Sequence, residues 1–348
     1  MRAVGIIANP VSARDIRRIV SHAGNLPIND RANIVLRLLT GLAAADVSDV
    51  VVMPENGGIR TQLMRTIERE RRMGTARLPA VTYLDMPVTS TYLDSAAAAR
   101  RMADMDVGAI VVLGGDGTHR VVASSCGQTP IAGVSTGTNN AFPEFREPTI
   151  TGLAVGLATS GLVPADIALA LNKRLVVTVN GRHEIALVDA AVVAERYVGA
   201  RAIWKTESFR DLFATFGEAD GIGMSSLVGL TDPLDRTTPQ GRRIRLAPAG
   251  TAPRTLAFPV APGLIGRIGI LSVETMAPDV PCRPSVTSGS IALDGERELT
   301  FGEADDVSIR LETDAFRTVC VSDCMAFAAR HGLLVHQSSS PCHEGEPR

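Results

Sequence analysis

The segment IVVLGGDGT at residues 110–118 decides the fold that this sequence predicts. An apolar run typical of a buried strand ends in a turn of three glycines around one carboxylate, Asp116. Because glycine has no Cβ, the backbone of such a turn can approach a ligand closely, and its N–H groups can bind phosphate. Residues 119–125 can begin a helix, whose positive end also favours an anion. The stretch therefore predicts a phosphate or nucleotide site.

The acid inside the turn needs its own explanation, because a carboxylate repels phosphate. Asp116 fits such a site if it binds a metal ion or takes a proton from an attacking hydroxyl. The spacing matches neither a P-loop nor the dinucleotide fingerprint. The alternative is a tight strand-to-helix turn in which aspartate serves turn chemistry alone. His119 follows directly, either touching phosphate or lying on the surface at the start of the helix.

Apolar strands alternate with helical patterns on both sides of this turn. The strands are expected at 3–8, 47–53, 81–84, 107–113 and 130–134, and the helices at 13–22, 30–43, 58–73, 90–105 and 149–160. Uniformly apolar strands separated by helices predict an α/β domain over residues 1–150, with a doubly wound parallel sheet covered on both faces. Ligands of such sheets bind at the carboxyl ends of strands, so the loops at 9–12, 114–118 and 135–140 are expected to converge.

The pattern changes after about residue 150, where Pro and Gly punctuate short apolar runs. Strands are expected at 175–179, 185–193, 244–246, 256–260, 268–273, 290–293 and 307–311, with one helix at 206–217. Successive short strands predict a second, β-rich domain over residues 151–337, which would carry the substrate side of the site. Residues 338–348 are polar and are predicted to be a disordered tail.

Composition excludes several classes of partner. A formal net charge of −2 and an aromatic content of 4% predict neither a basic nor a stacking surface for nucleic acid. No apolar run approaches the roughly 20 residues that cross a bilayer, so no membrane partner is expected. Five irregularly spaced cysteines suggest neither a disulfide framework nor a metal site, and they favour a reducing cytoplasm.

A second loop, GVSTGTNN at residues 133–140, follows the next predicted strand and is also rich in small residues. Its small residues, hydroxyls and amides can donate hydrogen bonds to a base, a ribose or a phosphate. The alternative is that Thr138 or Asn139 caps a short helix.

These motifs carry a resemblance to a known family. GGDGT after a buried strand resembles the signature that NAD kinases share with diacylglycerol and sphingosine kinases. The sequence Asn9-Pro10-x-Ser12 resembles the first loop of the lipid-kinase branch, whose Gly-Thr-Gly-Asn-Asp loop is similar to 137–140. Over most of its length the chain resembles the acetoin catabolism protein X group of ATP-NAD kinase-like proteins, through segments 5–10, 114–120, 135–143 and 197–204.

The resemblance implies a phosphotransferase that uses ATP and Mg²⁺ and acts on a small molecule. It makes Asp116 the base, or the orienting acid, for the acceptor hydroxyl. The other implied site residues are Gly114, Gly115, Gly117 and Thr118 for the phosphates, Asn9 and Ser12 beside the nucleotide, Gly137, Thr138, Asn139 and Asn140 in the ATP or acceptor pocket, and Asp294 and Glu296 from the second domain. Assembly into a homo-oligomer is a further implication.

Two positions bear on the acceptor. NAD kinases carry an Asn-Glu pair on an apolar strand that grips the adenosine of the dinucleotide, whereas the similar segment 186–193 presents Val188 and Asp189. An acid in an apolar run is costly unless paired, so Asp189 is expected to bind a ribose or polyol hydroxyl. The alternative for Asp294-Gly295-Glu296 is a type I′ hairpin turn.

The sequence thus predicts γ-phosphoryl transfer from ATP to a hydroxyl, with NAD as the leading acceptor by family. One alternative is a polyol or an acetoin-derived acceptor. The other is a nucleotide-binding protein without catalysis that regulates a catabolic operon or a partner enzyme.

Overall fold

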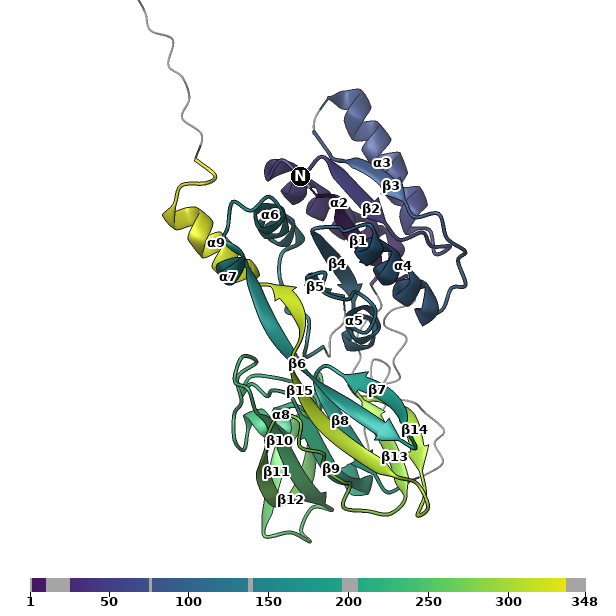
Figure 1. The fold of residues 1–348 in the computed structure, drawn as a ribbon, viewed down its shortest axis with the longest axis vertical. Coiled ribbons are helices and arrows are strands. Elements are labelled where there is room, and N and C mark those ends of the chain that lie inside the picture. The colour runs from purple at the N-terminus through teal and green to yellow at the C-terminus, as the bar shows by residue number, and fades with distance from the viewer. Residues whose placement is uncertain (1, 11–25, 75–76, 137–139, 196–205, 336–348) are drawn as a thin grey trace, which may run out of the picture.

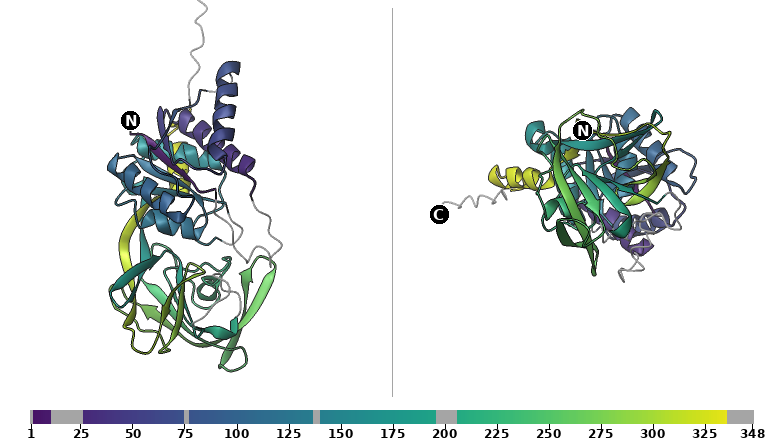
Figure 2. Two further views of the ribbon diagram at one scale, coloured as in Figure 1. Left: turned by 90° about the vertical axis from the view of Figure 1, so that its right-hand side faces the viewer. Right: turned by 90° about the horizontal axis from the view of Figure 1, so that it is seen from below.

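The computed structural model describes residues 2–10, 26–74, 77–136, 140–195 and 206–335 of the chain. The expected helix at 13–22 lies outside these residues. Two sheets organise the described part, one with eight strands and one with seven. The first sheet belongs to an α/β unit and the second to a β-rich unit, which lie end to end (Figure 1; Figure 2).

The α/β unit is built on five parallel strands in the order β3-β2-β1-β4-β5. Its elements are β1 (Val4–Ala8), α2 (Ile28–Ala44), β2 (Asp49–Val52), α3 (Ile59–Met73), β3 (Ala80–Tyr83), α4 (Tyr92–Asp104), β4 (Ala109–Gly114), α5 (Asp116–Ala123), β5 (Ile131–Ser135) and α6 (Pro148–Thr159). Side chains alternate between the faces: Ile6 packs in the cluster with α2, α3 and α6, while Ile7 packs in the cluster with α4 and α5. Helices on both faces explain why these strands are apolar throughout.

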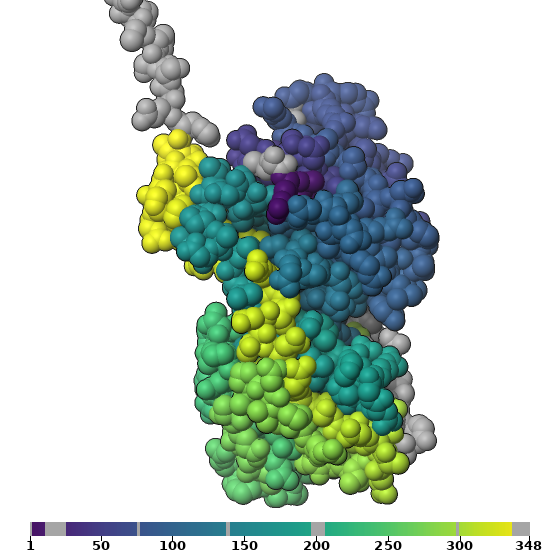
Figure 3. Space-filling view, viewed as in Figure 1, coloured from purple at the N-terminus to yellow at the C-terminus, as the bar shows by residue number. Residues whose placement is uncertain are grey.

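Two long strands connect the units. After α7 (Ala165–Ala168), β6 (Leu169–Val179) runs antiparallel to β15 (Val307–Val319), and both extend from the α/β unit into the β-rich unit (Figure 1). The strand β7 (Arg182–Ala186) pairs with β6 at the edge of the first sheet. The chain then ends its described part with α9 (Val321–Arg330), which packs with α2 and α6 and lies on the side of the α/β unit in Figure 3.

The β-rich unit is an antiparallel sheet in the order β11-β12-β10-β9-β8-β13-β14. Its elements are β8 (Asp189–Val193), the 3₁₀ turn η1 (Thr206–Ser208), β9 (Phe209–Ala214), α8 (Ser226–Gly229), β10 (Gly241–Ala247), β11 (Arg254–Ala261), β12 (Leu264–Met276), β13 (Gly289–Leu293) and β14 (Glu296–Phe301). One apolar cluster joins this unit to the other, because Leu187, Val188 and Phe216 pack in the same cluster as α4 and α5.

The doubly wound α/β domain and the β-rich second domain are confirmed. The helix expected at 206–217 is wrong, since that segment forms η1 and the buried strand β9. The single strand expected at 185–193 is also wrong, because residues 187 and 188 turn the chain from β7 in one sheet to β8 in the other. The boundary at residue 150 stays a prediction, because β6 and β15 extend through both units. None of the helices described could span a membrane.

Candidate functional site

The turn after β4 places Asp116 at the first residue of α5. β4 ends at Gly114, and the carbonyl oxygen of Gly115 accepts hydrogen bonds from the amides of Thr118 (3.0 Å) and His119 (3.1 Å). This end of β4 is directed toward the β-rich unit (Figure 1). The first turn of a helix, with its positive end, therefore lies where the two units meet.

The three glycines of the turn meet different surroundings. A Cβ on Gly114 would lie 2.5 Å from the Cβ of Thr118, and a Cβ on Gly115 would lie 2.9 Å from Oδ1 of Asn140. A Cβ on Gly117 would meet no described residue within 4 Å apart from its chain neighbours and the backbone of its own helix. Packing against Thr118 thus requires the first glycine, and the second lies against the end of the Asn140 side chain, whereas the third has open space among the described residues. A ligand can approach the backbone at Gly117.

The Asp116 carboxylate binds the segment after the second loop. Its Oδ2 accepts the amide of Ala141 at 3.0 Å, and its Oδ1 accepts the amide of Phe142 at 2.9 Å. Asn140 donates to the hydroxyl of Ser135, at the end of β5, at 2.9 Å. These bonds hold residues 140–142 against the glycine turn. Asp116 is half-buried, and its orientation is fixed by two backbone donors.

The β-rich unit binds the same segment through Arg236. Its guanidinium donates to the carbonyl oxygens of Ala141 and Phe142, both at 2.8 Å. It also pairs with Glu218 at 3.2 Å and lies 4.1 Å from the centre of the Phe216 ring. Sequence reasoning missed this residue, and no sequence signal could have found it, because its main partners are backbone carbonyls.

A second contact between the units comes from α5 itself. Arg120 donates to the carbonyl oxygen of Leu293 at 2.7 Å, and its Nη1 lies 3.9 Å from Oδ2 of Asp294. The bond reaches from the signature helix to the end of β13. Together, Arg120 and Arg236 fix the α5 end of the α/β unit against the β-rich unit.

Asp294 is buried and bound by backbone amides. Its side chain is 0% exposed and accepts the amides of Leu187, Val188 and Asp189 at 2.8 to 3.3 Å. Burial raises the pKa of this carboxyl, and the charge of Arg120 and the three amides oppose that shift. Asp294 and Gly295 have φ angles of 51° and 83°, as a type I′ turn between β13 and β14 requires. The hairpin alternative is therefore confirmed, and the acceptor role of Asp294 stays a prediction.

The other residues expected on the acceptor side differ in placement. Asp189 is buried at the start of β8. Its backbone carbonyl accepts the amide of Asp294 at 2.9 Å. Glu296 begins β14, opposite Leu293, and is half-buried. Val188 is 1% exposed within the apolar cluster between the units, so its side chain offers nothing to a dinucleotide.

Asn9 lies at the carboxyl end of β1, next to β4. Its amide donates to Leu113 at 3.4 Å, and its carbonyl accepts Arg31 at 2.6 Å. The structure thus brings Asn9 to the same edge of the sheet as the glycine turn. Ser12, Gly137, Thr138 and Asn139 lie outside the described residues, as does the segment 197–204.

His119 is fully buried, contrary to both expectations for it. Its Nδ1 donates to the carbonyl of Gly115 at 2.9 Å, which fixes the neutral tautomer, and its ring packs against Phe142. Nε2 makes no hydrogen bond within the described part of the chain. Burial lowers the pKa of His119 to about 4, against the opposing effect of the carbonyls of Gly115 and Val112. A neutral, buried ring supports the turn from behind and is shielded from solvent.

The arrangement can be tested against ATP and Mg²⁺. Open space at Gly117 beside the start of α5 fits a phosphate group. The described residues contain no group of three or more His, Cys, Asp or Glu side chains that could hold a metal ion. Mg²⁺ commonly uses one or two carboxylates together with substrate phosphates and water. Asp116 is the half-buried carboxylate at this turn.

Comparison with known proteins agrees with the two units. Residues 4–161 match the ATP-NAD kinase N-terminal domain family, and residues 173–314 match the acetoin catabolism protein X C-terminal domain family. The chain is 49% identical over 336 residues to acetoin catabolism protein X of Cupriavidus necator, an alignment that covers 95% of this chain and 93% of that relative.

Proposed function

The chain belongs to the acetoin catabolism protein X family, and from this premise we propose that it is an ATP-dependent kinase that transfers the γ-phosphoryl group to an alcohol. NAD is the first acceptor to test, because the α/β unit matches the ATP-NAD kinase N-terminal domain family. The observation that carries the proposal is the turn itself. Asp116 stands beside open space at Gly117, at the positive end of α5, where the two units meet.

Each residue of the turn has a part in this proposal. The first-turn backbone of α5 binds a phosphate through N–H groups, since Gly117 leaves the approach open. Asp116 orients the acceptor hydroxyl, or takes its proton, in a position set by the amides of Ala141 and Phe142. Mg²⁺, held by ATP and Asp116, would neutralise the charge of the phosphates. Catalysis of phosphoryl transfer rests mainly on such positioning and on charge stabilisation.

The test is ATP turnover over a panel of acceptors, NAD included, for the wild type, Asp116→Asn and Asp116→Glu. Product formation is followed by ³¹P NMR and ADP release. We expect an acceptor-dependent turnover that falls at least a hundredfold in both variants. Asp305→Asn is the matched control, because Asp305 also accepts a backbone amide, that of Gly302 at 2.7 Å, on the turn between β14 and β15.

A loss of folding must be separated from a loss of chemistry. In Asp116→Asn the side-chain NH₂ group would lie opposite a backbone amide, and two donors cannot bond to each other. Because this could destabilise the fold, thermal unfolding is measured on every variant. If Asp116→Glu folds and turns over like the wild type, Asp116 is not the catalytic carboxylate. If the wild type binds ATP and phosphorylates nothing in the panel, the protein is a nucleotide-binding module without catalysis.

A smaller acceptor is the second candidate, and the burial of Val188 favours it. NAD kinases bind the dinucleotide through an amide side chain at the position that Val188 occupies in this chain. The Val188 side chain instead packs in the apolar cluster between the units. A polyol or another hydroxylated metabolite of acetoin catabolism needs no such amide. The name of the Cupriavidus necator relative supports the same class of substrate. Acetoin, butane-2,3-diol and glycerol therefore belong in the panel beside NAD.

A further inference from the structure

A cavity of about 490 Å³ lies at the edge of the first sheet opposite the glycine turn. It is lined by Ala109 at the start of β4 and by Pro130 just before β5, whereas Gly114 and Ser135 end those strands on the other side. Small-molecule sites commonly occupy about 300 to 1,000 Å³. The cavity is therefore large enough for a metabolite and separate from the proposed phosphate site.

The sheet opens here because its strands diverge. β5 pairs with β4 through five residue pairs, but the register of β5 with β15 holds one pair, Ile131 with Thr318. β15 comes from the β-rich unit beside β6 and meets β5 only near its own end (Figure 1). The gap between β5 and these long strands is covered by the end of α6 and the start of α7, and it forms the cavity.

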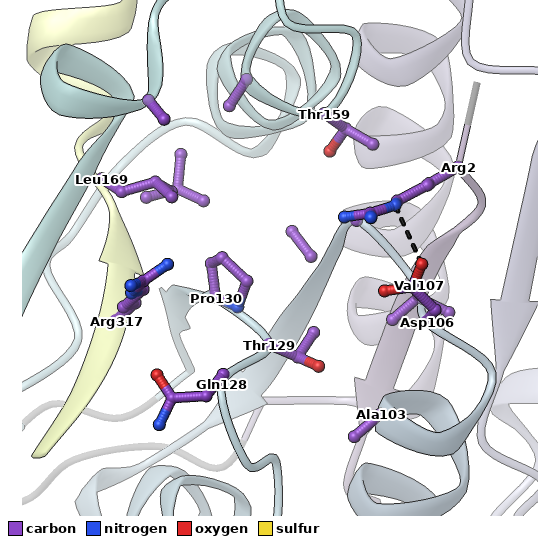
Figure 4. Close-up of a pocket in the computed structure, with 15 residues that line it drawn as sticks. Arg2, Ala103, Asp106, Val107, Gln128, Thr129, Pro130, Thr159, Leu169 and Arg317 are labelled. Carbon is purple, nitrogen blue, oxygen red and sulfur yellow. Dashed lines mark ion pairs between the residues drawn. The ribbon is translucent and has the colours of Figure 1, made fainter.

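Two arginines line this space on opposite sides. Figure 4 shows Arg2, just before β1, on one side and Arg317, near the end of β15, on the other. Arg2 pairs with Asp106 at 3.1 Å, and both side chains stay largely exposed. Arg317 is exposed and has no carboxylate within 4.0 Å among the residues described. The lining therefore carries two guanidinium groups and one carboxylate.

The remaining polar groups narrow the class of ligand. Gln128 and Thr129 line the same side of the cavity and can donate hydrogen bonds (Figure 4). Helices α4 and α6 also end here, and the partial negative charge at a helix C-terminus disfavours an anion beside it. The two arginines, at opposite sides of the cavity, are the cationic side chains of its lining that can offset the charge of an acidic group. Guanidinium is well suited to carboxylate and phosphate because it donates in pairs.

We propose that this cavity binds a small organic anion with two acidic groups, one at Arg2 and one at Arg317. Such a ligand would join the start of β1 to β15, the strand that comes from the β-rich unit. The site is independent of the proposed kinase chemistry, since none of its lining residues belongs to the glycine turn or its partners.

The test uses succinate, with two carboxylates, and 3-phosphoglycerate, with one carboxylate and one phosphate, as probes. Acetate at equal ionic strength reports non-specific effects. Isothermal calorimetry and thermal unfolding are measured without nucleotide on the wild type, Arg2→Ala, Arg317→Ala and Arg317→Lys. Arg245→Ala is the matched control, because Arg245 is an exposed arginine in β10, away from this cavity.

We expect at least one probe to bind the wild type and Arg245→Ala equally. Arg2→Ala and Arg317→Ala should each weaken that binding at least tenfold, and Arg317→Lys by less. The comparison of the two probes tells whether the second acidic group is a carboxylate or a phosphate. The proposal is overturned if neither probe binds better than acetate, or if both alanine variants bind like the wild type. Neither result depends on whether the protein turns over ATP.

Discussion

Asp116 and Arg236 bind the backbone of the same two residues, Ala141 and Phe142. The carboxylate accepts the amides of Ala141 and Phe142, and the guanidinium donates to the carbonyls of the same two residues. The acid comes from the α/β unit and the arginine from the β-rich unit. The position of the acid therefore depends on the second unit, although no atom of that unit touches it in these contacts.

Removal of Arg236 should weaken both the fold and the chemistry. Arg236→Ala deletes two bonds to carbonyls, an ion pair and a ring contact, so we expect the free energy of unfolding to fall by about 2 kcal/mol or more. ATP turnover should fall at least tenfold at a temperature where the variant stays folded, because residues 141–142 lose one of their two supports. Urea unfolding and turnover assays measure the two effects.

Arg174→Ala provides the comparison for Arg236. Arg174 has a similar exposed fraction, 24% against 22%, and also pairs with a glutamate, Glu312, at 2.8 Å. It has no bond to residues 141–142, so its loss should cost about 1 kcal/mol or less and leave turnover unchanged. Equal effects of the two substitutions would show that Arg236 is an ordinary ion-paired arginine.

Two glycines of the turn should respond in opposite ways to alanine. In Gly117→Ala the new Cβ has open space among the described residues and lies in a helix, so the stability of this variant should stay unchanged or rise by up to about 1 kcal/mol. Its affinity for ATP should fall at least tenfold if phosphate approaches there. Gly114→Ala brings a Cβ 2.5 Å from that of Thr118, so it should lose about 1 to 3 kcal/mol of stability.

Urea unfolding and an ATP titration distinguish the two variants. The informative protein is Gly117→Ala, because a stable variant removes misfolding as an explanation for weak binding. Wild-type affinity for ATP in that variant would mean that phosphate does not bind at this turn, whatever the effect of Gly114→Ala.

The α/β unit was predictable because its strands are covered on both faces. Ile6 and Ile7 face different clusters of helices, so both must be apolar, and the whole strand reads as one apolar run. The same property misled the prediction for 206–217. Phe209, Leu212 and Phe213 are spaced as on one face of a helix, yet all three are buried in a strand that is covered on both sides.

The site was predictable only in part. The glycine turn carries its own signal, since glycines around an acid are unusual in a strand-to-helix connection. Arg120 and Arg236 carry none, because they bind carbonyl oxygens, which every residue has. The break in 185–193 depends on Asp294, more than a hundred residues later in the chain, whose carboxylate binds the amides at 187–189. Local patterns cannot show a partner so distant in sequence.

Asp294 should be required for folding before any question of acceptor binding arises. In Asp294→Asn the NH₂ group replaces an oxygen that accepts buried backbone amides, so we expect a loss of about 2 kcal/mol or more. Asp279→Asn is a matched control, because Asp279 has a similar φ of 61° against 51° but an exposed side chain. If Asp294→Asn unfolds like the wild type but raises the KM of the acceptor, the residue contacts substrate instead.

The buried ring of His119 should make the protein sensitive to mild acid. Burial holds the pKa of His119 at about 4, whereas an unfolded histidine titrates near 6.5. Between these values the unfolded chain takes up a proton that the folded chain refuses. The contribution of the neutral His119 ring to the free energy of unfolding is therefore complete above pH 6.5 and is lost as the pH falls toward 4. The whole loss amounts to about 3 kcal/mol.

The pH dependence can be assigned to this ring by substitution. In His119→Asn the side-chain NH₂ can still donate to the Gly115 carbonyl, but the titrating group is gone. The free energy of unfolding of that variant, from urea titrations at pH 7 and pH 4.5, should fall less than that of the wild type. His183→Asn removes an exposed histidine on β7 and should keep the wild-type slope. An unchanged slope in His119→Asn would mean that other groups, and not this ring, cause the loss of stability in acid.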